Sequence, residues 1–248
     1  MNPPSPALSV IQRAILRRVP SLRLAAGARV LDAPCGEGAF ACALAEAGFH
    51  VCAADMDRAA EALLGARFRA ADLNGPLPWP DASFDAVFSI EGIEHLENRF
   101  LFLREVRRIL RPGGTLVLTT PNIVALRSRV RFFASGFYHR DSRPLNETER
   151  RPLHHIGLAT FSDLRYALHT SGFSLAEIGA THVKPVSWPY ALLAPWMYLY
   201  TLAAFRKEKD AAQRERNRTI RRTLFSRALL FGENLLLVAV SHNRVEES

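Results

Sequence analysis

Short apolar runs alternate with helix-like stretches between residues 29 and 120, and this alternation limits the possible folds more than any other feature of the chain. The apolar runs lie at 29–33, 50–54, 67–71, 84–90 and 115–120. The stretch at 97–110 shows the 3.6-residue apolar period of a helix that covers a sheet. Strands that alternate with helices favour a parallel sheet wound on both faces, so the sequence predicts an α/β domain.

Length and composition agree with a globular protein. The chain has 248 residues, of which 48% are hydrophobic and 23% charged, and this excludes a disordered, collagen-like or disulfide-rich chain. The three cysteines form no disulfide framework, and no Cys/His group has the spacing of zinc ligands, so no metal is predicted. Residues 1–20 lack the order of a signal peptide. They predict a short amphipathic packing helix, with a mitochondrial presequence as the alternative.

Each of the first three expected strands ends at an acidic side chain, namely Asp32, Asp55 and Asp72. A glycine-containing turn, 34–38, follows the first strand and precedes a helix. Glycine lets the backbone approach a ligand, the helix start offers free N–H groups, and a strand-end carboxylate can accept ribose hydroxyls. The pattern therefore predicts a nucleotide-type ligand. A nicotinamide-binding domain is the alternative, but Ala41 stands where its third glycine is expected.

Four segments resemble, in order and spacing, the class I S-adenosylmethionine-dependent methyltransferases, a group that includes quinone-biosynthesis and other small-molecule enzymes. They read VLDAPCGEG (30–38), AADMD (53–57), AADLNGPLPWPDASFDAVFSIEGIEHLEN (70–98) and LREVRRILRPGGTLVLTTPN (103–122). The resemblance implies S-adenosyl-L-methionine as the cofactor. It also implies a Rossmann-like, doubly wound sheet of seven strands, with the last strand, 234–241, antiparallel and a helical insertion between strands six and seven.

The resemblance implies nine cofactor-binding positions after the first four strands: Asp32, Pro34, Gly36, Gly38, Asp55, Met56, Asp72, Leu73 and Glu91. In the family pattern Asp32 holds the amino-acid portion, and the two glycines face the methionine half and the adenosine. Asp55 binds the ribose, Asp72 and Leu73 contact the adenine, and Glu91 lines the junction with the substrate. Pro34 replaces the usual glycine and has no N–H to donate, so the turn must differ locally.

Three histidines are candidates for catalysis, because a hydroxyl acceptor benefits from a general base that titrates near neutral pH. They are His95, His154 and His155, with His139 considered beside them. The alternative for His95 is a role in orienting its loop. Five arginines are either contacts for substrate phosphate or carboxylate groups or simply solvated: Arg127, Arg129, Arg131, Arg140 and Arg143. Cys35 is interpreted as a packing residue.

The segment 184–233 differs in character from the rest of the chain. Residues 185–205 (PVSWPYALLAPWMYLYTLAAF) carry no charge, and residues 206–227 carry nine basic and three acidic side chains. Pro189 and Pro195 interrupt the apolar stretch, which argues against a membrane span. Aromatic residues followed by basic ones suit an anionic membrane surface. A lid over the active site or a dimer interface is the alternative, and nucleic acid is disfavoured.

The sequence thus predicts three parts: a methyltransferase core with an N-terminal helix at 1–183, a helical, aromatic and basic insertion at 184–233, and the final strand with a tail at 234–248. The predicted activity is O-methylation of a membrane-associated lipid, quinone-like or envelope-glycan acceptor. The expected location is the bacterial cytoplasm or the inner face of its membrane. The alternatives are a soluble small-molecule methyltransferase with a helical lid and a non-catalytic, cofactor-binding membrane adaptor. The oligomeric state stays open.

Overall fold

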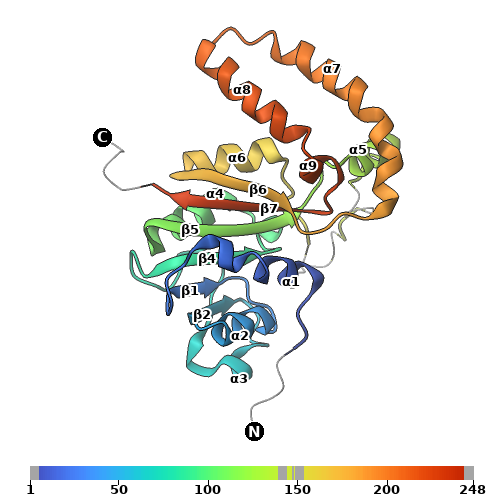
Figure 1. Ribbon diagram of the computed structural model, residues 1–248. Coiled ribbons are helices and arrows are strands. Elements are labelled where there is room, and N and C mark those ends of the chain that lie inside the picture. Colours follow the sequence, from blue (N-terminus) through green and yellow to red (C-terminus); the bar gives the residue numbers. More distant parts are fainter. Residues whose placement is uncertain (1–5, 139–143, 147, 149–153, 243–248) are drawn as a thin grey trace. The chain divides into compact units, whose positions relative to one another are not determined.

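The computed structural model describes residues 6–138, 144–146, 148 and 154–242 (Figure 1). The chain divides into two compact units. The first, which we name the sheet unit, comprises Met1–Thr120, Arg151–Glu177 and Leu236–Ser248. The second, the helical unit, comprises Pro121–Arg150 and Ile178–Leu235, and so contains the predicted insertion together with the segment after the fifth strand.

The sheet has seven strands in the order β3-β2-β1-β4-β5-β7-β6, and β7 is antiparallel, as predicted. The strands are β1 Arg29–Asp32, β2 His50–Asp55, β3 Phe68–Ala70, β4 Phe84–Ile90, β5 Leu110–Pro121, β6 Phe173–Ala180 and β7 Asn234–Ser241. Parallel pairs join β1 to β2 and β4, β2 to β3, and β4 to β5. The strand order reverses between β1 and β4. In open α/β sheets, ligands bind beyond the carboxyl ends of the strands at such a point.

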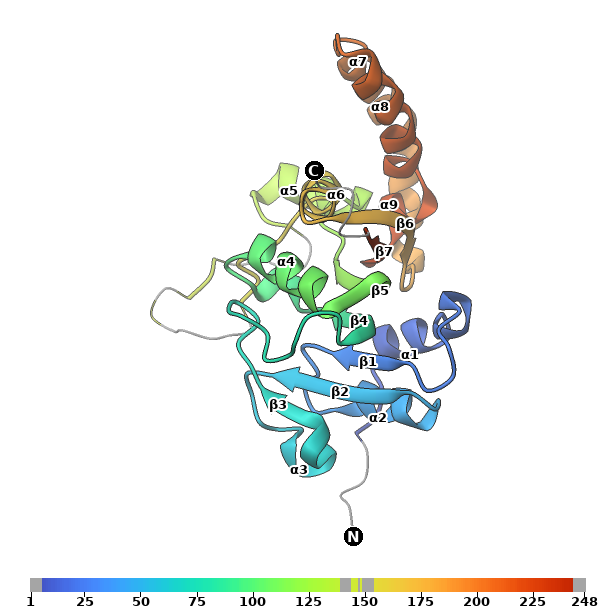
Figure 2. The same cartoon turned by 90° about the vertical axis from the view of Figure 1, so that its left-hand side faces the viewer.

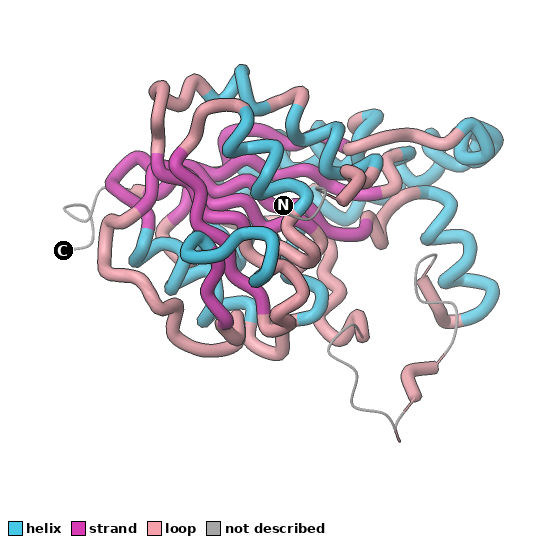
Figure 3. Tube along the Cα trace, turned by 90° about the horizontal axis from the view of Figure 1, so that it is seen from below, coloured by secondary structure: helices cyan, strands magenta, loops and turns pink. Residues whose placement is uncertain are grey.

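Helices cover both faces of the sheet (Figures 2 and 3). The helices α1 Val10–Leu16 and α2 Ala39–Glu46 lie on one face, and α4 Arg99–Ile109 lies on the other (Figure 2). The sheet unit also contains α3 Glu61–Leu64, α6 Phe161–Thr170 and the short 3₁₀ helices η1 Val19–Leu22, η2 Gly65–Arg67 and η3 Ile93–His95. The predicted N-terminal helix is confirmed, because Ile15 is fully buried.

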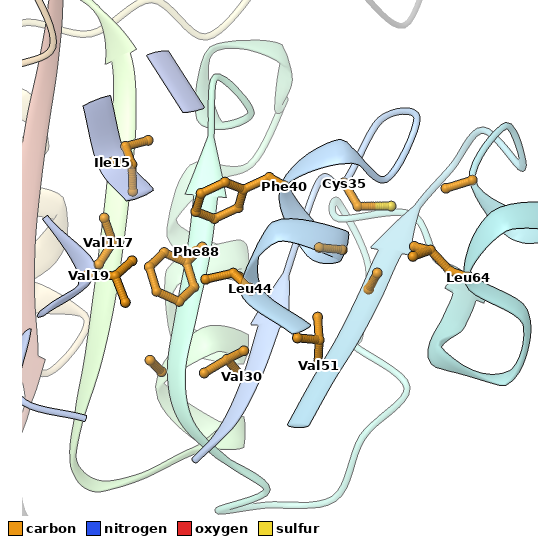
Figure 4. Packing of buried hydrophobic residues seen from close by; sticks show 14 of the residues in the cluster. Ile15, Val19, Val30, Cys35, Phe40, Leu44, Val51, Leu64, Phe88 and Val117 are labelled. Carbon is orange, nitrogen blue, oxygen red and sulfur yellow. The ribbon is translucent and has the colours of Figure 1, made fainter. Parts of the chain in front are cut away.

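The core of the sheet unit lies between α2, α1 and the central strands (Figure 4). Phe40 of α2 packs edge-on against Phe88 of β4, with ring centroids 5.4 Å apart. Val30 and Val117 complete the same layer from β1 and β5. This packing fixes the strand ends that carry the predicted cofactor residues.

Strand β5 begins earlier than predicted. The sequence RPGG at 111–114 was expected to separate a helix from a strand beginning at 115, but Leu110 already pairs with Phe84. The register then shifts before Ala86 pairs with Thr115, so the four residues form an irregularity inside β5. Gly113 has φ 74°, which suits glycine, and the turn-like residues are thus absorbed into the strand.

The helical unit contains α5 Leu126–Ser135, η4 Pro185–Leu193, α7 Ala194–Phe205, α8 Ala211–Leu224 and α9 Arg227–Phe231. Helix α5 was not predicted. Helices α7 and α8 run side by side as a hairpin (Figure 1), and this agrees with the expected helical insertion. At its base, Leu126, Leu230 and Phe231 form a small core with Tyr190, Met197 and neighbouring apolar residues. Among the described residues, no helix combines the length and hydrophobicity needed to cross a bilayer.

Candidate active site

Asp32 ends β1 and is buried, with 1% of its surface exposed. Its Oδ2 has no hydrogen-bond partner among the described residues. Burial, and secondarily the charge of Asp55, raise the pKa of Asp32 well above its usual value. A buried carboxylate with an unsatisfied oxygen fits a cationic ligand, because such a ligand would stabilise the ionised form.

The turn after β1 contains two glycines that face different surroundings. Gly36 has φ 53°, and a methyl group on its Cα would meet no heavy atom within 4 Å, so a ligand can approach the backbone there. Gly38 has φ 86°, and the same methyl group would lie 3.1 Å from Cδ1 of Leu64. Gly38 therefore lets α3 pack closely against the start of α2.

Pro34, the predicted departure from the family pattern, follows a cis peptide bond. Its ring fills the space beside Gly92, because a methyl group on Gly92 would lie 2.3 Å from Cδ of Pro34. The turn after β1 and the loop after β4 are thus in direct contact. The local difference expected at Pro34 is accommodated by a glycine on the neighbouring loop, and Gly36 keeps its open surroundings.

Asp55 connects the ends of β1 and β2. Its Oδ2 accepts a 2.8 Å hydrogen bond from the N–H of Gly36, and its Oδ1 accepts a 3.0 Å bond from the N–H of Asp57. A carboxylate has about four acceptor positions, so the two oxygens can still accept hydroxyl groups. Met56 follows with 54% of its surface exposed. These positions agree with a ribose-binding carboxylate beside an accessible apolar side chain.

After β3, the side chain of Asp72 is exposed and Leu73 is buried. Oδ1 of Asp72 accepts a 2.9 Å bond from the N–H of Asn74, and Oδ1 of Asn74 accepts one of 2.9 Å from the N–H of Glu97. The bonds join this loop to the segment before α4. Asn74 was not singled out from the sequence, although an Asp-x-Asn turn at a strand end was a usable signal.

Glu91, directly after β4, has φ 51°, a conformation that non-glycine residues adopt at a cost of about 1–3 kcal/mol. Its N–H donates to the backbone oxygen and to Oγ1 of Thr119, at 3.2 and 3.1 Å, and these bonds hold the conformation. Such a residue marks a constrained loop at the carboxyl end of β4. The role of Glu91 at the junction between cofactor and substrate stays a prediction.

The candidate histidines come together although they are far apart in the sequence. The ring centroids of His95 and His155 are 4.9 Å apart, and Nδ1 of His95 lies 3.1 Å from the backbone oxygen of His154. His154 thus contacts His95 through its backbone carbonyl. Glu94, which is fully buried beside them, was missed by the sequence reasoning, which considered the histidines alone. His139 lies outside the described residues.

Two of the arginines expected to contact substrate or solvent make contacts inside the helical unit. Nη1 of Arg127 lies 3.6 Å from Oε1 of Glu233, a buried residue. Arg129 donates a 2.7 Å hydrogen bond to the backbone oxygen of Val124, and burial lowers its pKa. Arg131 is exposed, and Arg140 and Arg143 lie outside the described residues.

Cys35 is part of the hydrophobic core, which confirms its interpretation as a packing residue. Burial and the nearby charges of Asp32 and Asp55 raise the pKa of its thiol. The thiolate is therefore disfavoured, and Cys35 is not suited to act as a nucleophile.

Residues 31–118 match the family described as "Methyltransferase domain". A Mycolicibacterium smegmatis protein named "Probable S-adenosylmethionine-dependent methyltransferase" is 36% identical over 162 residues, 63% of this chain and 56% of the relative. The 27-O-demethylrifamycin SV methyltransferase of Amycolatopsis mediterranei is 38% identical over 39% of this chain and 40% of its own length. The ubiquinone biosynthesis O-methyltransferase of Xanthomonas campestris is 33% identical over 39% of this chain and 44% of its own length. The chain thus spans about half the length, or less, of these relatives.

Solved structures share the fold. A SAM-dependent methyltransferase from Archaeoglobus fulgidus aligns with a TM-score of 0.53 and 17% identity, covering 93% of this chain and 94% of that one. The [4+2]-cyclase SpnF aligns with a TM-score of 0.53 and 18% identity, covering 94% of this chain and 80% of that one. At this identity the likeness concerns the fold alone, and the second structure carries a name other than methyltransferase. The fold alone therefore does not specify the reaction.

Residues 31–118 of the sheet unit carry a methyltransferase domain, and the sheet has the fold of the class I S-adenosylmethionine-dependent methyltransferases. Its cofactor is S-adenosyl-L-methionine, which supplies a sulfonium methyl group that is already activated for transfer. The unsatisfied oxygen of buried Asp32 and the open surroundings of Gly36 fit this cationic group. Because this methyl group is already activated, transfer requires from a protein mainly that cofactor and acceptor are held in position.

Proposed function

We propose that this protein O-methylates a hydroxyl-bearing acceptor that is held at a membrane surface: a lipid, a quinone-like ring or an envelope glycan. The methyltransferase domain supports the reaction type. The printed names of two relatives, a ubiquinone biosynthesis O-methyltransferase and a 27-O-demethylrifamycin methyltransferase, support oxygen as the methylated atom. The hairpin of α7 and α8 is the observation that carries the membrane part of the proposal.

Helix α7 exposes its apolar side chains instead of burying them. None of its residues is buried, and Trp196, Leu199 and Tyr200 are 68%, 63% and 70% exposed. The rings of Trp196 and Tyr200 lie roughly parallel, with centroids 6.2 Å apart, and form one aromatic surface. Exposed aromatic patches of this kind mark contacts with membranes or with other proteins.

Helix α8 adds positive charge beside this aromatic surface. It has five arginines and one glutamate between residues 211 and 224, and none of its residues is buried. Arg221 lies 5.6 Å from the ring centroid of Tyr198, so the cationic and aromatic surfaces meet along the hairpin. Basic residues near an anionic bilayer contribute about 1 kcal/mol each. The combination supports a hairpin that lies on the bilayer with α7 in the headgroup region.

Flotation with vesicles of mixed neutral and anionic phospholipid tests the membrane contact. The triple variant Trp196→Ala, Leu199→Ala, Tyr200→Ala is expected to lose vesicle binding by tenfold or more, because each large side chain contributes about 1.5–3 kcal/mol when it leaves water. Tyr166→Ala, which removes a 65% exposed aromatic residue from α6 in the sheet unit, is the matched control. Equal flotation of the wild type and the triple variant would remove the membrane part of the proposal.

Activity on extracted acceptors tests the reaction. Incubation of the protein with radiolabelled S-adenosylmethionine and a bacterial lipid or glycan extract is expected to label an acceptor in base-stable ether linkage. Label on nitrogen or carbon would contradict O-methylation. A protein that floats with vesicles and binds the cofactor but labels nothing would favour the membrane adaptor.

The second candidate is a small-molecule methyltransferase in which the hairpin has another role, such as a lid. The relative named for rifamycin favours this candidate, because its printed name concerns an individual compound. Flotation separates the two proposals: turnover of a dissolved hydroxyl compound without vesicle binding would support the small-molecule enzyme.

A further inference from the structure

Glu94, His95 and His155 form a compact group in the sheet unit, which we name the Glu-His-His cluster. One ligand atom from each residue lies within 4.8 Å of the other two. Ligands bound at about 2.1 Å in a tetrahedral site are about 3.4 Å apart, so small side-chain rotations would bring these atoms onto one ion. We propose that the cluster binds a divalent transition-metal ion. Two imidazoles and one carboxylate are a donor set typical of zinc and ferrous iron.

The hydrogen bonding of His95 favours metal binding by its other ring nitrogen. Nδ1 lies 3.1 Å from the backbone oxygen of His154. A carbonyl oxygen only accepts hydrogen bonds, so Nδ1 must carry the proton, and the lone pair of the neutral ring is on Nε2. Metal-binding histidines are usually oriented in this way, with the second nitrogen donating to a carbonyl or a carboxylate.

Glu94 supplies the carboxylate of the cluster. Its surface is fully buried, and an ionised carboxylate away from water is costly unless a positive charge or hydrogen bonds compensate for it. A divalent ion placed between this carboxylate and two neutral imidazoles supplies such a charge.

The backbone holds the two ligand segments against each other. The N–H of Gly157 donates a 2.7 Å hydrogen bond to the backbone oxygen of Glu94. A methyl group on Gly157 would lie 2.7 Å from the oxygen of Leu96 and 3.0 Å from that of Ile93. Only glycine allows this approach, so the segment carrying His155 is fixed close to η3. The chain thereby positions ligands from segments that are distant in the sequence.

The metal ion would also position the acceptor, and this part of the inference rests on the proposed O-methylation. Three protein ligands leave at least one coordination position open. The cluster follows β4 and Glu91, at the carboxyl ends of the strands, where the predicted cofactor residues also lie. An acceptor hydroxyl bound at the open position has a lowered pKa, and its proton passes to solvent water, so the oxygen remains as the stronger nucleophile. His95 then acts as a ligand, and not as the general base expected from the sequence.

Cobalt binding tests the site without any need for activity. The full chain is treated with a chelator, dialysed and titrated with Co²⁺, and visible absorption reports coordination by nitrogen and oxygen. We expect one ion per chain, and Zn²⁺ should displace it. His155→Ala and Glu94→Gln should each weaken binding at least tenfold. His154→Ala is the matched control, because it keeps the carbonyl that contacts His95 and should bind Co²⁺ as the wild type does.

The outcomes separate this inference from the proposed function. The metal site is overturned if the wild type binds no cobalt, or if His155→Ala binds as tightly as His154→Ala while both show native circular dichroism. Tight binding with methyl transfer that is insensitive to chelation keeps the site and removes its role toward the acceptor. Metal binding without turnover of any hydroxyl acceptor supports the site while counting against the proposed O-methylation.

Discussion

Strand β4 in the sheet unit and helix α7 in the helical unit are both rich in apolar residues, but they use them in opposite ways. Five of the seven residues of β4 are buried, whereas α7 has none buried in twelve. The polar residues differ correspondingly, since the sheet unit buries Asp32 and Glu94, whereas the hairpin exposes all of its arginines except the half-buried Arg221. Apolar residues thus form the core in the sheet unit. In α7 they remain on the surface, where they are available for a contact with another molecule.

The largest expected contrast is between Phe88→Ala and Leu199→Ala. Phe88 is fully buried and packs against Phe40, so its truncation should lower the free energy of unfolding by about 3–5 kcal/mol. Leu199 is 63% exposed, and its truncation should change that free energy by less than about 0.5 kcal/mol. Urea unfolding followed by circular dichroism measures both. A strongly destabilising Leu199→Ala would show that the surface of α7 is covered in solution.

The second contrast concerns two neighbouring carboxylates at the end of β2. Asp55→Ala removes the acceptor of the Gly36 N–H and the proposed ribose contact, so the affinity for S-adenosylhomocysteine should fall about 100-fold. The control is Asp57→Ala. Asp57 is exposed and accepts a 3.1 Å bond from the N–H of Ala59. Calorimetry should show nearly wild-type affinity for the control variant. Equal affinities for both variants would contradict the assignment of Asp55.

Asn122 allows a similar test inside the helical unit. Its Nδ2 donates to the backbone oxygens of Leu229 and Gly232, at 3.0 and 2.9 Å, so Asn122→Ala leaves buried carbonyls at the end of α9 unsatisfied. The expected cost is about 1–3 kcal/mol. Hydrogen exchange should accelerate in residues 226–232 and stay unchanged in β1. Asn217→Ala, at a half-buried position of α8, is the control, and faster exchange throughout the chain would contradict a local effect.

The sheet was largely predictable because its information is local. Strand-end acids, the glycine turn and the helical period lie within short segments, and the first five strands were located from short apolar runs. The RPGG segment shows the limit: proline and glycine were taken to separate β5 from the preceding helix, but pairing with β4 drew Leu110 into the strand. Helix α5 was missed because its segment was interpreted through its arginines, although Leu126, Val130 and Phe133 recur at the spacing of a helix.

The site was predictable only where each residue could be interpreted from its own strand. Asp32 and Asp55 follow from strand ends, whereas the Glu-His-His cluster depends on bringing His155 to η3 from a distant segment. The space that Gly92 leaves for Pro34 is likewise a tertiary feature, since the two residues belong to different loops. Contacts of this kind leave no periodic signal in a single sequence.

The smallest predicted effect concerns Asp32 and appears without cofactor. Because burial raises the pKa of Asp32 in the folded state, folding favours the protonated form. The stability linked to this proton is fully present below the pKa of the unfolded chain, about 3.9, and is lost as the pH rises through the folded-state pKa. Asp32→Asn cannot ionise, so it does not lose this stability. The free energy of unfolding of the variant should match that of the wild type near pH 4 and exceed it increasingly at higher pH.

Thermal unfolding of both proteins between pH 4 and pH 8, without and with S-adenosylmethionine, measures this effect. The cationic cofactor should favour the ionised carboxylate, so it should stabilise the wild type more than Asp32→Asn and reverse the order of their melting temperatures. A variant that is less stable than the wild type at pH 8 without cofactor would mean that another group already compensates the Asp32 charge. The reversal would identify Asp32 as a residue whose cost to the fold is offset only when the cofactor is bound.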